Sequence, residues 1–462
     1  MSSAASDLRA DALRIWMAGL EAVRSERLMR EAVRIEGRTL VLGNDFRGLP
    51  DDALRIDLST VRRIAVVGAG KAGAGMAAAL EEILGQPRMD EKQLIGWINV
   101  PADCVRELQR IHLHAARPAG VNEPTEAGVA GTNEILRMVG SLGPDDLCIA
   151  LISGGGSALM PAPIEGISLA DKVAVTRFLS AAGANIAELN TVRKQLSRIK
   201  GGGLARACQA GRLVTLIISD IPGDPLDLIA SGPTVPDQST PQEALKILEQ
   251  FGGREAGVPA VVLDVLTHKP EGEHRAPPIC QVNNIIIGNN ATAVMAAGKE
   301  AERLGYEVET ILDTERDLTA EQVGVRLLEK IGGRGKHCIV EGGECVVKLA
   351  PQQERGLGGR NQQTVLAALA ELRKHDSIDE NRREILILSA GTDGEDGPTD
   401  AAGAFVDWQV IEEAERRGMN RGDFLRRNDA YHFFEPLGAL VKTGPTNTNV
   451  CDVRVVVAER RK

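Results

Sequence analysis

The sequence predicts an α/β protein with a Rossmann-like, doubly wound parallel sheet in its first domain and a smaller α/β domain with a mixed sheet. In the first half, apolar strand-like runs alternate with helix-forming segments, which is typical of a parallel sheet covered by helices. Adjacent strand-like pairs in the second half indicate a mixed sheet. Only 3% of the 462 residues are aromatic, so the cores must be built from Val, Ile, Leu and Ala, which suits helices on parallel strands.

The predicted elements follow in a regular order along the chain. The first domain is expected to have one or two leading helices, then strands at 64–67, 94–100, 111–116, 147–152 and 211–220, with helices at 71–84, 125–139 and within 169–199. A segment rich in Gly, Pro and charge predicts a linker at 251–278. The second domain is expected to have strands at 337–349, 384–391, 438–444 and 452–458, and a helix at 361–374. We therefore place the domains at 1–265 and 280–460, with the active site in the cleft between them.

Charge and composition narrow the possible partners. The net charge is −10 at pH 7 and no basic tract stands out, so we expect no nucleic-acid binding. No apolar run is long enough to span a bilayer and the N-terminus lacks a secretory pattern, so we expect no membrane partner and a cytoplasmic location. The seven cysteines are dispersed and form no CxxC pair, which fits a reducing compartment.

A first glycine loop, GAGKAG at 68–73, follows a predicted strand and precedes a predicted helix. Its spacing matches a dinucleotide-binding loop, yet Asp103 lies too far along the chain to be the acid that contacts the ribose. Ala65 and Ala72 stand where a Walker A motif needs Gly and Ser or Thr. The loop leaves Lys71 at the carboxyl edge of the sheet, either as a functional cation or as an ordinary surface lysine at a tight turn.

A second glycine loop, SGGGSA at 153–158, gives the stronger signal. Successive amides in a glycine turn form a nest for anions, and Ser157 adds a hydroxyl. Asp220 ends a predicted buried strand, where carboxylates that bind magnesium are common. In the second domain, Arg360 follows the glycines of GLGG and Asp393 follows a buried strand. Two lobes that present such groups to one cleft would bind a phosphorylated ligand.

These blocks together resemble the class II glycerate 2-kinases, the MOFRL-containing family. The matching segments are VVGAGKAG, LISGGGSALMPAPIEGISLADK, NTVRKQLSRIKGGGLA, ISDIPGDPLDLIASGPTVPD, GGECVVKL, GLGGRNQ, SAGTDGEDGPTDAAGAFVD and TGPTNTNV. They cover most of the chain from about residue 60, in the order of the family. The resemblance implies transfer of the γ-phosphoryl group of ATP to the 2-hydroxyl of D-glycerate, with ATP and Mg²⁺ or another divalent metal as cofactors.

The resemblance also implies roles for individual residues. Lys71 and Arg360 are expected to be catalytic. We expect the remaining site residues to be Ser153, Gly154, Gly155, Gly156, Ser157 and Ala158 for the nucleotide phosphates, Gly70, Arg193, Lys200 and Asn361 for the substrate, and Asp220 and Asp393 for the metal. Arg193 and Lys200 also fit a solvated helix face.

The chain departs from the family pattern at three positions. Arg117 stands where the family usually has the His of a His-Pro pair, Gln195 replaces a His, and Asn447 replaces a Gly. These changes concern the substrate more than the reaction type. An NAD(P)H-dependent hydroxypyruvate reductase is the alternative function, and a non-catalytic binding protein is a third; either a monomer or a homodimer is compatible with the sequence.

Overall fold

The computed structural model describes residues 3–43, 53–121, 123–270, 277–315, 317–330, 335–372 and 384–459. Contacts divide the chain into two compact units. The N-terminal unit comprises Leu28–Ser219 and Asp224–Ile287, and the C-terminal unit comprises Met1–Arg27, Asp220–Gly223 and Gly288–Lys462. Within the described residues, no helix has the length and apolar character needed to cross a membrane.

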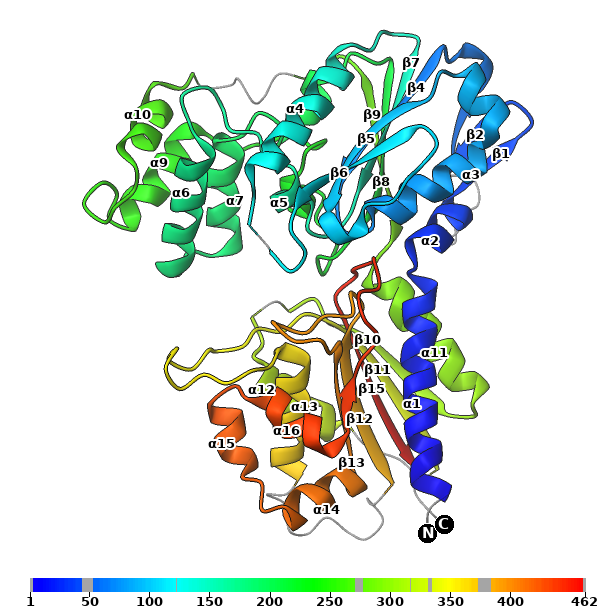
Figure 1. Cartoon of the computed structure of the whole chain (residues 1–462), viewed down its shortest axis with the longest axis vertical. Coiled ribbons are helices and arrows are strands. Elements are labelled where there is room, and N and C mark those ends of the chain that lie inside the picture. The colour runs from blue at the N-terminus through cyan, green and yellow to red at the C-terminus, as the bar shows by residue number, and fades with distance from the viewer. Residues whose placement is uncertain are drawn as a thin grey trace. The chain divides into compact units, whose positions relative to one another are not determined.

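The N-terminal unit contains a six-stranded sheet in the order β6-β5-β4-β7-β8-β9 (Figure 1). Its strands are β4 (Arg63–Ala69), β5 (Ile95–Pro101), β6 (Ile111–Arg117), β7 (Asp146–Ile152), β8 (Arg212–Ile218) and β9 (Gln281–Gly288). The pairs β5–β6, β4–β5, β4–β7 and β7–β8 are all parallel. Helices α3 (Gly73–Glu91) and α4 (Glu126–Gly140) connect strands of this sheet. The predicted parallel α/β domain is confirmed.

Strand order positions the two glycine loops. Strands β4 and β7 are parallel neighbours in the middle of the sheet, and every residue of β7 is buried. Because parallel neighbours end at the same edge, the loop at 68–73 and the loop at 153–158 lie beside each other. The second loop runs into the four-residue helix α5 (Gly156–Leu159).

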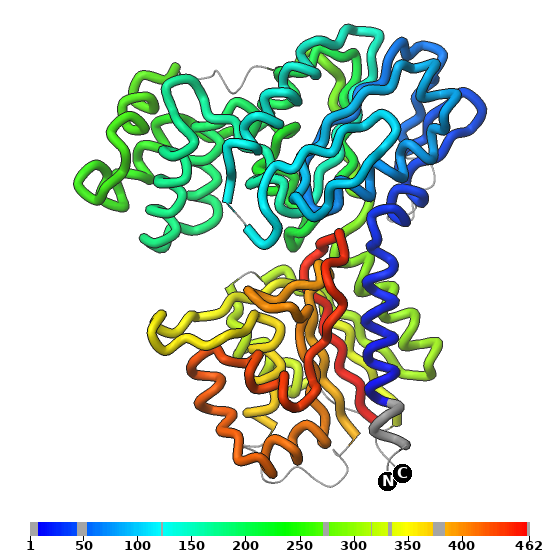
Figure 2. The backbone as a smooth tube through the Cα atoms, viewed as in Figure 1, coloured from blue at the N-terminus to red at the C-terminus, as the bar shows by residue number. Residues whose placement is uncertain are grey.

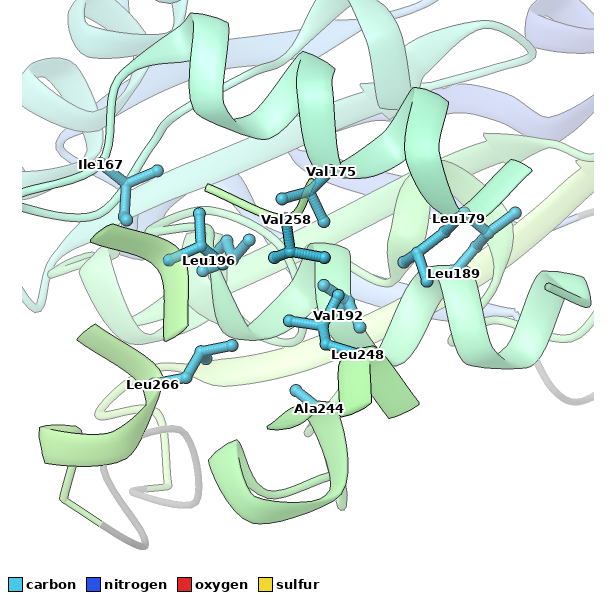
Figure 3. Close-up of a cluster of buried hydrophobic side chains, with 11 residues drawn as sticks. Ile167, Val175, Leu179, Leu189, Val192, Leu196, Ala244, Leu248, Val258 and Leu266 are labelled. Carbon is cyan, nitrogen blue, oxygen red and sulfur yellow. The ribbon is translucent and has the colours of Figure 1, made fainter. Parts of the chain in front are cut away.

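Four helices form a separate apolar cluster in the same unit (Figure 3). They are α6 (Leu169–Ala181), α7 (Ile186–Gln195), α9 (Pro241–Gln250) and α10 (Ala260–His268). The linker expected at 251–278 is therefore helical over the range of α10, because Val262 and Leu266 are fully buried in this cluster. Residues 271–276 of that segment lie outside the described residues.

A small antiparallel sheet precedes β4 and was not predicted. It consists of β1 (Val33–Glu36), β2 (Thr39–Leu42) and β3 (Leu54–Asp57). Each strand has four residues, which is too short for an alternating pattern to stand out in the sequence. The remaining α-helices described in this unit are α2 (Ser25–Ala32), whose first three residues are assigned to the C-terminal unit, and α8 (Gly203–Ala207).

The C-terminal unit contains a second six-stranded sheet, in the order β10-β11-β15-β12-β13-β14 (Figure 1). Its strands are β10 (Glu307–Leu312), β11 (Lys336–Gly343), β12 (Ile385–Gly391), β13 (Gly403–Asp407), β14 (Leu440–Val441) and β15 (Asp452–Glu459). Strands β10 and β11 are parallel and the other pairs are antiparallel, so the predicted mixed sheet is confirmed. The helices with it are α11 (Asn290–Arg303), α12 (Ala320–Glu329), α13 (Arg360–Leu372), α14 (Trp408–Arg416), α15 (Arg421–Arg426) and α16 (Ala430–Phe434).

The N-terminal helix α1 (Ser3–Ala22) belongs to this unit rather than to the first domain, where residues 1–265 were expected. It lies alongside α11, as Figure 2 shows. Its apolar stripe includes Ile15 and Trp16, both fully buried, and the Trp16 indole Nε1 donates a hydrogen bond to the carbonyl of Ala390 at 3.3 Å. Burial of this stripe explains the placement, since apolar periodicity in a sequence does not say which sheet a helix covers.

Candidate active site

The first glycine loop, at 68–73, donates hydrogen bonds that hold the second loop, at 153–158, in place. The amides of Gly70, Lys71 and Ala72 donate to the Asn99 carbonyl, the Gly154 carbonyl and the Ser153 hydroxyl at 3.2, 2.9 and 3.0 Å. A Cβ at Gly70 would lie 2.0 Å from the Ser153 Oγ, so only glycine allows this approach. These amides are therefore not available to the pyrophosphate of a dinucleotide.

The second glycine loop keeps amides that no described residue engages. Among the described residues, nothing accepts a hydrogen bond from the amides of Gly154, Gly155 or Ser157. Gly155 has a φ of +78°, a left-handed conformation that turns the backbone at this point. Three backbone N–H groups that are free to donate at one turn can bind an anion.

Cations surround this loop. A Cβ at Gly155 would lie 3.2 Å from Arg117 Nη2 and 3.7 Å from Lys71 Cγ, so both side chains pass next to it. Arg117 is only 4% exposed, and its guanidinium donates to the carbonyl of Val121. The side chain that stands in place of the His expected from the resemblance is thus a buried cation beside the loop.

A cavity of about 270 Å³ opens between this loop and helices α6 and α7. Its lining includes Gly155, Ser157 and Ala158 of the loop and the basic side chains of Lys172, Arg177, Arg193 and Lys200. The Lys200 ammonium donates to the Ser157 carbonyl at 2.9 Å and to its hydroxyl at 2.5 Å. Burial, with Lys172 and Arg193 nearby, lowers the pKa of Lys200 well below its usual value.

In the C-terminal unit, Arg360 begins helix α13 and is held by two carboxylates. Its Nε and Nη2 donate to the two oxygens of Asp452 at 2.7 and 3.0 Å, and Nη1 donates to Glu344. Asp452 is fully buried, and burial alone would raise its pKa; attraction and hydrogen bonds from Arg360 outweigh burial and lower that pKa. Arg360 keeps 31% of its side-chain surface exposed.

Asn361 and Asp396 fix the start of the same helix. The Asp396 carboxylate accepts hydrogen bonds from the amides of Asn361 and Gln362 at 3.0 and 2.8 Å, which caps α13. Burial raises the pKa of Asp396 to about 6. A Cβ at Gly359 would lie 2.3 Å from this carboxyl group, which accounts for the last glycine before Arg360. The Asn361 amide also donates to Asp452 at 3.0 Å, so its predicted contact with substrate competes with a structural one.

The carboxylates expected to bind metal lie in the same unit. The pKa of Cys451 is raised by burial and by the nearby carboxylates of Glu344, Asp220 and Asp452. A Cβ at Gly391 would lie 3.0 Å from Asp393 Oδ1 and 3.5 Å from Asp452 Oδ1, which places these two carboxylates near each other. Among the described residues, no three His, Cys, Asp or Glu side chains gather closely enough to hold an ion by themselves.

The two other departures from the family pattern are structural. Gln195 is fully buried and donates to the Asp237 carboxylate and to Ser239, at 2.9 to 3.2 Å. Asn447 has a φ of +57°, a conformation that Asn tolerates better than most residues and that suits the glycine found there in the family. Neither side chain lines the cavity.

Sequence reasoning missed Lys172, Glu344 and Asp452. Lys172 had a detectable signal, because it stands with Leu169, Val175 and Leu179 on the buried stripe of α6. A lysine on an apolar stripe is a candidate for a buried cation. Asp452 and Glu344 had no comparable signal, since each simply borders an apolar strand.

The structure is that of an α/β protein with a cavity whose cationic lining suits small anions. The family model described as a domain of unknown function, DUF4147, matches residues 11–267, and the MOFRL family model matches residues 337–452. The chain is 37% identical to a glycerate kinase from Homo sapiens over 86% of this chain and 84% of that protein. It is 34% identical to a D-glycerate 2-kinase from Thermotoga maritima over 87% of this chain and 93% of that one.

The solved structures agree with these matches. A crystal structure of a glycerate kinase from Thermotoga maritima superposes with a TM-score of 0.77 at 32% identity, covering 98% of this chain and all of that one. The chain belongs to the MOFRL-containing glycerate kinase family.

Proposed function

We propose that this protein is an ATP-dependent D-glycerate 2-kinase, which transfers the γ-phosphoryl group of ATP to the 2-hydroxyl of D-glycerate and yields 2-phosphoglycerate and ADP. The observation that carries the proposal is the second glycine loop, where unengaged amides of Gly154, Gly155 and Ser157 adjoin the side chains of Lys71 and Arg117. Preorganised donors and cations are what phosphoryl transfer requires, because little covalent chemistry falls to the protein.

In the proposed mechanism, each unit contributes one catalytic cation. The amides of the loop at 153–158 bind nucleotide phosphates, and Lys71 neutralises charge that develops on the phosphoryl group. Arg360 presents its exposed guanidinium surface to the same group, while Asp452 keeps it oriented. This mechanism requires both cations to act on one phosphoryl group. Asp220 or Asp393 accepts the proton of the attacking hydroxyl.

The donor set fits a divalent metal of the magnesium type. Mg²⁺ is usually held by one or two carboxylates, with phosphates and water completing its ligands, so it does not need three side chains. Whichever of Asp220 and Asp393 does not accept the proton would supply such a carboxylate, in a group where Arg360 faces Glu344 and Asp452 as well. When bound, the metal would reduce the negative charge of the phosphates.

The alternative, a hydroxypyruvate reductase, depended on the loop at 68–73. The amides of Gly70, Lys71 and Ala72 already donate to protein acceptors, which argues against a dinucleotide there. The seven free cysteines support the proposed cytoplasmic location.

One pair of assays tests the proposal. D-glycerate with MgATP is scored for ADP and, by coupling to enolase, for 2-phosphoglycerate against 3-phosphoglycerate. We expect ADP and 2-phosphoglycerate in equal amounts. Oxidation of NADH or NADPH with hydroxypyruvate in the absence of ATP, together with no ADP formation, would reject the kinase.

A further inference from the structure

The cavity between the second glycine loop and helices α6 and α7 has an unusual charge balance. Its cationic lining consists of Lys172, Arg193 and Lys200, together with Arg177. Among the described residues of the lining, the one carboxylate is Glu123, and the Arg177 Nε and Nη2 donate to its two oxygens at 2.9 and 2.7 Å. Three cations therefore face the cavity without a lining carboxylate to balance them.

Arg193 lacks a protein partner in the part of the chain that the structure describes. Its only interactions there are repulsions with Lys172 and Lys200. A guanidinium has five N–H donors and remains charged at any ordinary pH. A partly buried guanidinium without an acceptor is unfavourable unless a ligand supplies one.

Lys172 is a buried cation whose ammonium keeps N–H donors without a protein acceptor among the described residues. It is 7% exposed and its ammonium donates to one acceptor, the Leu196 carbonyl, at 2.8 Å. A lysine has three donor hydrogens, so two remain. Lys200 differs, because it already contacts Ser157 twice and Ser231 at 3.4 Å.

The size of the cavity limits its ligand. About 270 Å³ lies below the ~300–1,000 Å³ that drug-sized ligands occupy, and so suits a small acid rather than a whole nucleoside triphosphate. We propose that this cavity binds the carboxylate of the acceptor substrate, a small 2-hydroxy acid, and that Lys172 and Arg193 donate to that carboxylate. The inference rests on the proposed kinase function and adds Lys172 as a substrate-binding residue.

The surroundings of Lys172 add a measurable property. The charged groups around it are Arg193 on α7, Lys200 after α7 and Lys269 after α10. The cavity lining adds Arg177, on the same helix as Lys172, and Glu123, which accepts hydrogen bonds from Arg177. The Asp171 carboxylate on α6 accepts hydrogen bonds from the amide and hydroxyl of Ser168. Burial and the repulsion from Arg193 and Lys269 lower the pKa of Lys172 to about 7. A bound carboxylate raises that pKa again, so binding above pH 7 takes up a proton.

Isothermal titration of the full-length protein with D-glycerate tests this inference. Wild type is expected to bind with uptake of up to one proton at pH 8.5, which lies roughly 1.5 units above the pKa of Lys172. The uptake is measured as the difference in binding enthalpy between two buffers of unlike ionisation enthalpy. Lys172→Met should weaken binding roughly tenfold to a hundredfold, as expected for a lost hydrogen bond to a charged group. Lys172→Arg keeps a permanent charge, so it should bind with less proton uptake and a flatter pH profile.

The matched control is Lys92→Met. Lys92 is 6% exposed in the same unit and donates to the Val61 carbonyl at 3.1 Å, but it does not line the cavity. The Lys92→Met variant should bind D-glycerate with the same affinity as wild type. If Lys172→Met does not fold, the comparison of proton uptake between wild type and Lys172→Arg decides the matter, and equal uptake overturns the inference.

Failure of the inference and failure of the kinase proposal give different results. If wild type forms ADP from D-glycerate and MgATP but Lys172→Met binds D-glycerate equally well, the inference alone is wrong. If Lys172→Met instead loses affinity for the ATP analogue AMP-PNP and keeps that for D-glycerate, the cavity binds nucleotide phosphate and the inference is again overturned. If wild type neither binds D-glycerate nor forms ADP, both proposals fall.

Discussion

Asp452 is the residue on which the position of Arg360 depends. It is fully buried and accepts both hydrogen bonds of a bidentate guanidinium contact. Removal of one partner from a buried ion pair leaves the other without compensation, at a cost of about 3–5 kcal/mol. Glu344 alone cannot orient the guanidinium, because it contacts only Nη1.

We therefore predict that Asp452→Asn lowers the free energy of unfolding by about 3 kcal/mol and lowers kcat at least tenfold with little change in KM. Urea unfolding and steady-state kinetics measure the two effects. Asp400→Asn is the control, since Asp400 pairs with Lys442 at the surface of the same unit and should leave both quantities unchanged. Normal kcat in Asp452→Asn would show that Asp452 has no positioning role.

Lys71 gives a second prediction at this scale. Lys71→Met should lower kcat by about 10²–10³, the usual effect of losing one electrostatic contact in a transition state, and should leave the fold intact. Circular dichroism and the coupled assay give the two readouts. Lys246→Met, an exposed lysine of α9, serves as the control. A Lys71→Met variant with nearly normal kcat would exclude Lys71 from catalysis.

At the scale of elements, the turn at Gly155 allows the effect of backbone strain on stability to be distinguished from an effect on ATP binding. Gly155 and Gly183 have similar φ values, +78° and +84°, but only a Cβ at Gly155 meets other atoms, the nearest being Arg117 Nη2 at 3.2 Å. Alanine at either position should cost about 1–2 kcal/mol of stability. Only Gly155→Ala should also raise the KM for ATP. Equal KM values in the two variants would count against the loop as a phosphate site.

Helix α6 provides a pH dependence whose sign is fixed by Lys172. Its pKa falls from 10.5 to about 7 in the folded protein, so the folded state binds fewer protons than the unfolded state between these values. Stability should then rise with pH across this range, by up to about 1.4 kcal/mol per pH unit from this group. Lys172→Met lacks this contribution. The free energy of unfolding of the variant relative to that of wild type should therefore fall from pH 7 to pH 10. Thermal unfolding at several pH values measures this difference, and a constant difference would contradict it.

The elements also show what the sequence could predict. The long apolar strands β4, β7 and β8 and the glycine loops after β4 and β7 were recognisable, because apolar runs and glycine clusters are local signals. The three short strands β1 to β3 and the assignment of α1 to the C-terminal unit were not, because each depends on tertiary pairing. The same holds for the site. Arg360 was expected from its glycine context, whereas its partner Asp452 lies 92 residues away in sequence and is joined to it only by folding.

At the scale of the whole molecule, the proposed mechanism requires Lys71 of one unit and Arg360 of the other to act in a single step. Residues that act together in one transition state show strongly non-additive effects on kcat. We predict that the double variant Lys71→Met/Arg360→Met is hardly slower than the slower single variant. Single-turnover rates of the four proteins give the comparison. Multiplicative losses would indicate that the two cations act in separate steps.

The interlocked backbone of the two glycine loops limits how this scaffold can be redesigned. A protein engineer who wished to introduce a nicotinamide coenzyme at the GAGKAG turn would first have to supply new donors for the Asn99 and Gly154 carbonyls and the Ser153 hydroxyl, so that the amides of the turn are released. Breaking these hydrogen bonds would disrupt the neighbouring turn at 153–158. The glycine motif at 68–73 therefore stabilises the second loop, and it is a poor starting point for a change of coenzyme.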